Sequence, residues 1–215
     1  ILIEKCFFHP AARATRHKWN ESGVVGVKAK ISGLAGLALE VVDGGTMENV
    51  TIRDITMDGG VGTPIFVRFA RRHAPLPGTE TYFKNVLIER VKMLKPAESR
   101  IASSITGLPN QRITGVTVRD CDLFFPGGGT AQEAADTNVP EVPKGYPEYF
   151  LFGLKRALPA YGFYIRHAEG VKIENVNIRL AAPDARPKFH LEDTPNPALW
   201  EALAKPVLSE SYRNE

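Results

Sequence analysis

One short pattern recurs along this chain and constrains its fold more than any other feature. Each copy alternates apolar with polar residues and then places two polar residues before the next apolar one. The clearest copies span 50–57, 86–93 and 116–123, with a further copy at 1–8 and a weaker one at 176–179. An alternation of period two is typical of strands that turn one face inward, and helical repeats would show a period of 3.6.

The spacing of the copies indicates a stack of strands. The residues before the first apolar position are 36, 30 and 60 residues apart along the chain, in the order Asn49, Asn85, Gly115 and Asn175. Asparagine suits a bend, where its side chain bonds nearby backbone groups and stacks on its equivalents. A strand at 27–31 supplies the missing copy between Ile1 and Val50. This periodicity predicts an all-β chain, a parallel β-helix in which each coil relies on its neighbours.

A second strand follows each copy, and we expect these strands to form another parallel sheet. They are predicted at 37–40, 64–68, 101–105, 162–166 and 189–192. The repeat also places Cys6 and Cys121 at the inward position that Ile55 and Val91 occupy. Two cysteines do not indicate a disulfide scaffold, so we interpret both as small apolar core residues.

Three segments depart from the repeat. Residues 126–160 contain five prolines, three consecutive glycines and several aromatic residues, which predicts a long loop packed on the coils. Residues 70–82 form a second, basic loop. Pro197 and the apolar residues after it predict a short amphipathic helix over 197–205 that covers the end of the stack. The expected organisation is therefore a β-helix over 1–193, with the inserted loop, and a C-terminal cap or tail over 194–215.

The composition limits the kinds of partner that the chain is expected to bind. No run of about 18 apolar residues occurs, so a membrane span is not expected. The formal net charge of +3 comes from scattered basic residues, so nucleic acid is not the first partner expected, and an acidic polymer of another kind fits equally well. The opening Ile1-Leu2-Ile3 already has strand character, so we expect the chain to begin partway through a larger protein, with a processed N-terminus as the alternative.

Several segments together resemble glycoside hydrolase family 28, the polygalacturonase family, in its bacterial pectin-degrading branch. The resemblance runs from about residue 36 to 193 and rests on 36–45, 48–52, 64–68, 104–109, 125–130 and 160–167. It implies a right-handed parallel β-helix that hydrolyses galacturonic acid or related linkages in pectin, with inversion and without a cofactor. The resemblance also implies a secreted or periplasmic protein and an acidic polysaccharide or oligosaccharide as partner.

The family motifs are largely absent from this chain. Family members carry Asn-x-Asp, Asp-Asp, Gly-His-Gly and Arg-x-Lys, and the first three do not occur here. The one candidate for the fourth is Lys28-Ala29-Lys30, which has lysine where the family has arginine. Two hypotheses follow: the chain is a glycosidase or part of one, or it is a non-catalytic carbohydrate-binding or structural fragment. A lyase of the same fold would need clustered aspartates for Ca²⁺.

Residues near the ends of the second set of strands are the candidates for binding. Arg68 and Arg166 occupy similar positions on their coils, and arginine pairs bidentately with the carboxylates of a polyuronate. The full expected substrate-binding set is Lys30, Arg68, Ser104, Tyr164, Arg166 and His167. The alternative is that these are solvated edge charges, or ion-pair partners of the acidic residues nearby.

Glu40 and Asp43 are the candidate catalytic carboxylates. A glycosidase needs one such group protonated and one ionised, and these two lie close together near the proposed face. Their position before Gly44-Gly45 also suits a plain turn. The five histidines lack the spacing of metal ligands, so no metal site is predicted.

Overall fold

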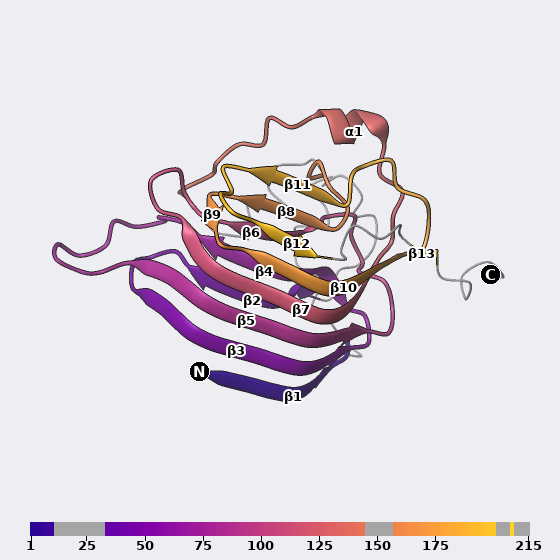
Figure 1. The fold of residues 1–215 in the computed structure, drawn as a ribbon, viewed down its shortest axis with the longest axis horizontal. Helices are drawn as coiled ribbons and strands as arrows, with labels where there is room; N and C mark the ends of the chain where they lie inside the picture. The colour runs from indigo at the N-terminus through magenta and orange to yellow at the C-terminus, as the bar shows by residue number, and fades with distance from the viewer. Residues whose placement is uncertain (11–32, 145–156, 201–206, 209–215) are drawn as a thin grey trace.

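A computed structural model describes residues 1–10, 33–144, 157–200 and 207–208 of the 215-residue chain. Within these ranges the chain is mostly β, with one helix, α1 (Ala131–Ala135), and two sheets of parallel strands (Figure 1). Sheet A contains β1 (Leu2–Phe8), β3 (Thr46–Met57), β5 (Tyr82–Met93), β7 (Ile113–Phe125), β10 (Lys172–Leu180) and β12 (Ala198–Trp200), in that order, with β9 (Ala168–Glu169) beside β7 and β13 (Val207–Leu208) beside β10. Sheet B has the order β11 (Phe189–Glu192), β8 (Phe163–Arg166), β6 (Ser103–Thr106), β4 (Val61–Phe69) and β2 (Gly33–Val41).

The chain runs alternately through the two sheets, which explains why each sequence copy is followed by a second strand. From β2 to β8 the strands belong to sheets B, A, B, A, B, A and B in turn. The second strands predicted at 37–40, 64–68, 101–105, 162–166 and 189–192 correspond to β2, β4, β6, β8 and β11. The strand expected at 27–31 lies outside the described residues.

The inward positions of the repeat form columns of buried side chains between the sheets. In sheet A, Val50 pairs with Val86 and Val86 with Val116, and the next inward residues follow the same register. Ile55, Ile88 and Val118 are at most slightly exposed. Full burial of such a side chain stabilises the fold by roughly 1.5–3 kcal/mol, so the stack depends on neighbouring strands covering one another.

Two backbone bends give the sheet A strands their shape. Asn49, Asn85, Gly115 and Gly170 have positive φ at the first bend. Five residues later, positive φ recurs at the second bend, in Asp54, Arg90, Asp120 and Asn175. Asn, Asp and Gly tolerate this region best, which accounts for most of the residue types at these positions.

The register corrects the expected alignment of the last copy. Val176 pairs with Cys121, and Asn175 lies beside Asp120, to whose carboxylate it donates at 2.8 Å. Asn175 therefore belongs to the second bend, and the residue equivalent to Asn49 is Gly170. The alignment slipped by five residues because the same apolar alternation occurs on both sides of the second bend.

The two cysteines lie at the inward position predicted for them. Cys6 pairs with Ile55 in the register of β1 and β3, and Cys121 pairs with Val176. Cys121 is buried, and this burial raises the pKa of its thiol to about 12. Cys121 is therefore a protonated, apolar core residue at neutral pH; Cys6, on the edge strand, is partly buried.

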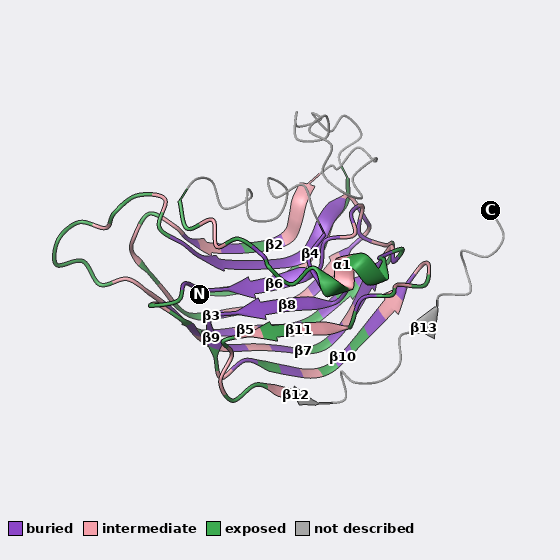
Figure 2. Cartoon of the chain, turned by 90° about the horizontal axis from the view of Figure 1, so that it is seen from above, coloured by how far each residue is buried: buried purple, intermediate pink, exposed green. Residues whose placement is uncertain are grey.

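The three central strands of sheet B differ from the strands of sheet A in being buried on both faces. Every residue of β4, β6 and β8 is buried, whereas outward residues of β5 and β7 include exposed ones (Figure 2). The inward side chains of sheet B join the main core. The outward ones, including Phe66 and Tyr164, pack with Val139, Leu158 and Ala160 from the loop over 126–160.

The helix expected at the C-terminal end is wrong where the structure describes it. Residues Ala198–Trp200 form β12, which pairs in parallel with Lys172–Glu174 of β10. Unpaired backbone groups at the edge of β10 offer a partner to any following chain, and this outweighs a weak helical pattern. Within the described part of the chain, no helix has the length and apolar character needed to cross a membrane.

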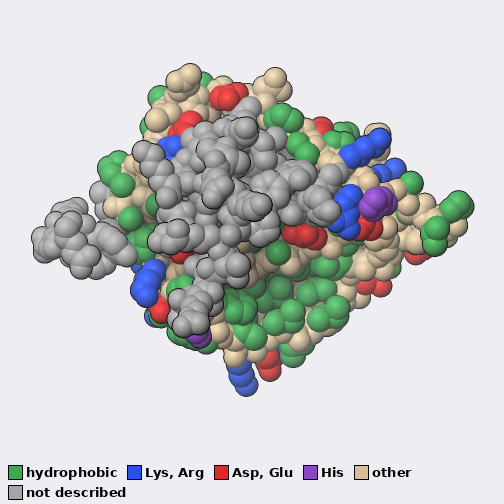
Figure 3. Space-filling view, turned by 180° about the vertical axis from the view of Figure 1, so that it is seen from behind, with side chains coloured by type: hydrophobic (Ala, Val, Ile, Leu, Met, Phe, Trp, Pro, Cys, Tyr) green, Lys and Arg blue, Asp and Glu red, His purple; other side chains and the backbone are tan. Residues whose placement is uncertain are grey.

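The other end of the stack is apolar. A hollow of about 300 Å³ lies where β1 and β2 are the edge strands, and it is lined by residues that include Ile1, Ile3, Leu37 and Leu39. Hydrophobic side chains also gather on the face of the molecule that Figure 3 presents. Ile3 occupies an inward position but remains 42% exposed, because no described strand covers it.

Candidate functional site

The outward face of sheet B carries two rows of side chains that the parallel register sets side by side. One row consists of Ala38, Phe66, Ser104, Tyr164 and His190. The other, called here the arginine row, consists of Glu40, Arg68, Thr106, Arg166 and Glu192. Arg68 and Arg166 thus stand two strands apart, about 10 Å along the sheet, with Thr106 between them.

Arg68 is fully buried, and its guanidinium is held by oxygen acceptors. It donates to Thr106 Oγ1 at 3.1 Å and to the carbonyls of Glu141 and Val142 at 2.7 and 3.0 Å. Burial, and then the like charge of Arg166, lowers the pKa of Arg68 to about 10. The group stays charged at neutral pH, and the repulsion between the two arginines favours an anion between them.

Arg166 is 1% exposed and contacts the same loop. It donates to the carbonyls of Val139 and Pro140 at 2.6 and 3.2 Å, and its Nη2 lies 3.2 Å from a carboxylate oxygen of Glu141. Its guanidinium also lies 5.6 Å from the centre of the Tyr164 ring, which stacks on His190. Arg166 is therefore surrounded by polar and aromatic groups and does not face open solvent.

His167 follows Arg166 and stands between two carboxylates. Its Nδ1 lies 2.7 Å from Asp193 and its Nε2 lies 2.9 Å from Glu141. Arg112 approaches Asp193 at 2.5 Å, and this contact, followed by that of His167, lowers the pKa of Asp193. Asp193 is consequently ionised. Of the two carboxylates around the His167 ring, Asp193 is the one that Arg112 also holds.

The four residues 139–142, called here the strap, cross the arginine row. They follow α1, whose N-terminus has a capping box formed by Thr130 and Glu133. Arg100 pairs with Glu133 at 3.0 Å and so fixes the helix to the sheet B side of the molecule. The long loop expected at 126–160 thus packs on the strands with its described residues, and 145–156 lie outside the described part.

The base of this loop is held by a buried ion pair. Arg186 and Asp184 are 1% and 0% exposed and approach at 2.8 Å. Asp184 also accepts from the amide of Gly129, and Arg186 donates to the carbonyls of Arg100 and Leu158. A side chain at Gly129 would collide with both ionic groups, which gives this glycine a packing role.

The structure brings together four of the six predicted binding residues. Arg68, Tyr164, Arg166 and His167 lie on or beside the arginine row, as described above. Ser104 lies between Phe66 and Tyr164, but its hydroxyl is buried and has no hydrogen-bond partner among the described residues. Lys30 lies outside the described residues.

The candidate catalytic residues occupy different surroundings. Glu40 lies next to Arg68 in the register of β2 and β4. Asp43 follows the end of β2 and forms an ion pair with Arg72, whose hydrogen bond lowers the pKa of Asp43. Asp43 is therefore ionised at neutral pH, which suits a general base and not a general acid. Among the described residues, no group of three His, Cys, Asp or Glu side chains is arranged to hold a metal ion.

Sequence analysis missed three residues of this site: Arg112, Glu141 and Asp193. Arg112 and Asp193 lie in loops that the repeat does not align, so their contact across 81 residues had no sequence signal. Glu141 carried a weak one. Glu141 stands between Pro140 and Pro143 in a loop. Prolines restrict the backbone dihedral angles, so an acidic side chain between them is held in a limited range of positions.

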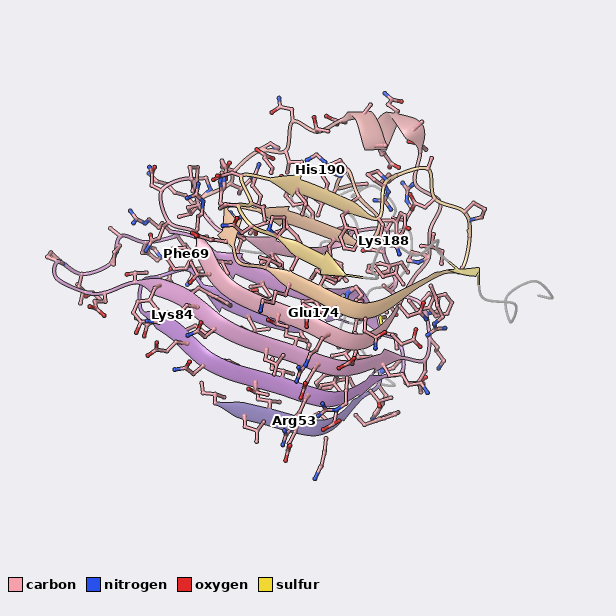
Figure 4. All side chains as sticks on the ribbon, viewed as in Figure 1. Arg53, Phe69, Lys84, Glu174, Lys188 and His190 are labelled. Atoms are coloured by element: carbon pink, nitrogen blue, oxygen red, sulfur yellow. The ribbon has the colours of Figure 1, made fainter. Side chains whose placement is uncertain are left out.

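The outward face of sheet A provides an internal comparison. Its central row alternates in sign from strand to strand in the order Glu4, Arg53, Glu89, Arg119 and Glu174. Arg53 pairs with Glu4, and Arg119 pairs with Glu89, each at 2.6 Å. This charge ladder, of which Figure 4 labels Arg53 and Glu174, pairs its charges within the sheet.

Comparisons of the chain with protein-family models, with curated proteins and with solved structures found no match.

Proposed function

We propose that this chain is a right-handed parallel β-helix and forms all or part of a pectin-type glycosidase that binds acidic polysaccharide on the outward face of sheet B. The two parallel sheets, visited in turn by the chain, support the β-helix. Connections between parallel strands of one sheet are right-handed in almost all proteins, which supports the handedness. The segments that resemble glycoside hydrolase family 28 support the substrate class.

The arginine row is the observation that carries the proposal. Two buried arginines stand two strands apart on one face, about 10 Å along the sheet, and their guanidiniums donate to oxygen atoms. A polyuronate presents a carboxylate on every sugar, and arginine is the side chain best suited to bind that group. His167 adds a ring nitrogen that lies within hydrogen-bond distance of a carboxylate oxygen beside Arg166.

Hydrolysis with inversion needs two carboxyl groups that flank the bond, one as acid and one as base. Glu40 lies at one end of the arginine row, and Asp43, ionised by Arg72, lies beyond it. Glu141 and Asp193 form a second pair around His167, at the other end. We assign catalysis to Glu40 and Asp43, because Glu40 lies beside Arg68 on the arginine row and Asp43 follows the end of the same strand.

A non-catalytic binding role is the second candidate. The motifs Asn-x-Asp, Asp-Asp and Gly-His-Gly do not occur in the chain. Of the four carboxylates considered above, Asp43, Glu141 and Asp193 form ionic contacts, and Glu40 stands beside Arg68. The arginine row would then bind acidic sugar without cleaving it. Both candidates use the same face and differ in whether bonds are broken.

Reducing-end release from polygalacturonate, measured beside retention on immobilised polygalacturonate, separates the two. For the glycosidase we expect release that Glu40→Gln and Asp43→Asn abolish. The control Glu48→Gln, on sheet A, removes the same charge and should leave release unchanged. Retention without release by any variant would support the binding role, and neither retention nor release would refute both.

A further inference from the structure

The strap fills the site that the proposed function assigns to an acidic sugar. Four successive carbonyl groups, those of Val139, Pro140, Glu141 and Val142, accept hydrogen bonds from the two arginines of the row. The side chain of Glu141 then places one carboxylate oxygen 3.2 Å from Arg166 and the other 2.9 Å from His167. A free carboxylate bound by the same two side chains would make the same contacts.

Most of these contacts are of a kind that a ligand can replace. Val139 is the one strap residue that is buried, while Pro140 is exposed and Glu141 and Val142 are half-buried. The strap therefore buries little apolar surface, and apolar burial is what most resists release of a segment. Its attachment depends on hydrogen bonds and ionic contacts, which an acidic ligand can supply in their place.

The strap backbone also carries strain. Val142 has φ of 43°, in the left-handed region that a β-branched residue almost never adopts. Its carbonyl is one of the acceptors of Arg68, so the contact with the row helps to hold it there. Outliers of this kind concentrate at clamps and switch segments, and release of the strap would relax this one.

His167 provides the second contact to the carboxylate of Glu141. A neutral imidazole has one N–H, yet both ring nitrogens of His167 lie within hydrogen-bond distance of a carboxylate oxygen. Asp193 is held in addition by Arg112 and therefore stays in place. The contact with Glu141 is the one that a competing carboxylate can exchange.

We propose that residues 139–142 form an autoinhibitory strap, in which Glu141 occupies the carboxylate site of Arg166 and His167 until a uronic acid displaces it. This inference rests on the proposed binding of acidic polysaccharide to the arginine row. It adds that the site is closed in the free protein and that part of the binding energy of the ligand is used to release the strap.

The test compares Glu141→Gln, Glu141→Ala and the unaltered protein. Glu80→Gln is the matched control, because Glu80 is exposed in a different loop and loses the same charge. Calorimetry measures binding of a galacturonic acid trisaccharide, with a neutral galactose trisaccharide as a second control. Amide hydrogen exchange over 137–144 measures opening of the strap without ligand.

We expect both Glu141 variants to bind the acidic trisaccharide about 10-fold more tightly than the unaltered protein, a typical size for coupling between two states. Strap exchange should quicken in both, while Glu80→Gln should change neither quantity. Equal or weaker binding by the Glu141 variants, or unchanged strap exchange, would overturn the strap and leave the proposed function standing. Absence of binding by every variant would overturn both.

Discussion

The outward faces of the two sheets use arginine in opposite ways. On sheet A, the ladder residues Arg53 and Arg119 alternate with glutamates on neighbouring strands and remain partly open to solvent. On sheet B, Arg68 and Arg166 are buried, stand on either side of a threonine, and donate to the strap. On sheet A, each ladder arginine pairs with a glutamate of a neighbouring strand. On sheet B, the two arginines stand on either side of Thr106, and their contacts include the strap and Glu192, which lies 3.7 Å from Arg166.

The difference in burial also distinguishes arginines with a structural role from arginines with a proposed binding role. Exposed ion pairs contribute roughly 0–1 kcal/mol each, and their loss is easily tolerated. Burying a guanidinium costs several kcal/mol unless every contact is good, so a protein keeps two such groups on one face only with strong compensation. The compensation on sheet B comes from a loop distant in sequence, and this arrangement is the basis of the functional proposal.

The largest predicted effect is on stability when one arginine from each face is removed. Arg166→Met should lower the free energy of unfolding by about 3 kcal/mol, because it leaves Glu141 and two strap carbonyls without their buried donor. Arg53→Met, on the ladder, should cost about 0.5 kcal/mol, because the side chains of Arg53 and its partner Glu4 are 38% and 30% exposed. Urea denaturation followed by circular dichroism measures both, and equal costs would remove the distinction between the faces.

Acid should destabilise the protein by protonating carboxylates on sheet A. Hydrogen bonds from Lys84, Arg90 and Arg119 lower the pKa values of Glu48, Asp54 and Glu89, respectively. A carboxylate whose pKa is lower in the folded than in the unfolded protein stabilises the fold above its unfolded pKa, about 4, and loses that contribution as pH falls through its folded pKa.

The urea midpoint should therefore stay level down to about pH 5 and fall steadily below pH 4. Glu89→Gln should make this acid slope shallower, since it removes one of the shifted groups. A variant with the slope of the unaltered protein would show that the Glu89 contacts do not form in solution.

Salt should distinguish the two kinds of contact. A double-mutant cycle on Glu4 and Arg53, whose side chains are 30% and 38% exposed, should give a coupling of about 0.5 kcal/mol that largely disappears in 1 M NaCl, because solvent ions screen exposed pairs. The corresponding cycle on Glu141 and Arg166 should keep most of its coupling, since Arg166 is 2% exposed at its side chain. Identical salt dependence in the two cycles would contradict the burial of the arginine row.

The smallest predicted effect concerns the backbone. Sheet A strands pass through residues of positive φ at their bends, whereas none of the described sheet B strands contains such a residue. Asn85→Gly should change stability by a few tenths of a kcal/mol, and Asn85→Ala should cost about 1 kcal/mol, because alanine lacks both the amide and the tolerance for this conformation. Thermal unfolding of the two variants measures the difference.

Sequence patterns predicted the strands well and the site only in part. The inward positions of the copies at 50–57, 86–93 and 116–123 were predicted with their register, because period-two alternation fixes which face is buried. The copy at 176–179 was misaligned, because alternation alone does not distinguish the two sides of a bend. The C-terminal helix was wrong, because pairing with an open sheet edge overrode a local preference.

The residue pattern of the chain was enough to predict the all-β character, the two sets of strands and the inward columns that include both cysteines. These depend on local alternation and β-branched residues, which each segment carries within itself. The tertiary structure alone decided what the arginines of sheet B contact. Glu141 reaches Arg166 and His167 across 25 and 26 residues, and Asp193 reaches Arg112 across 81. Contacts between loops follow no period, so they exist only once the stack has placed the loops side by side.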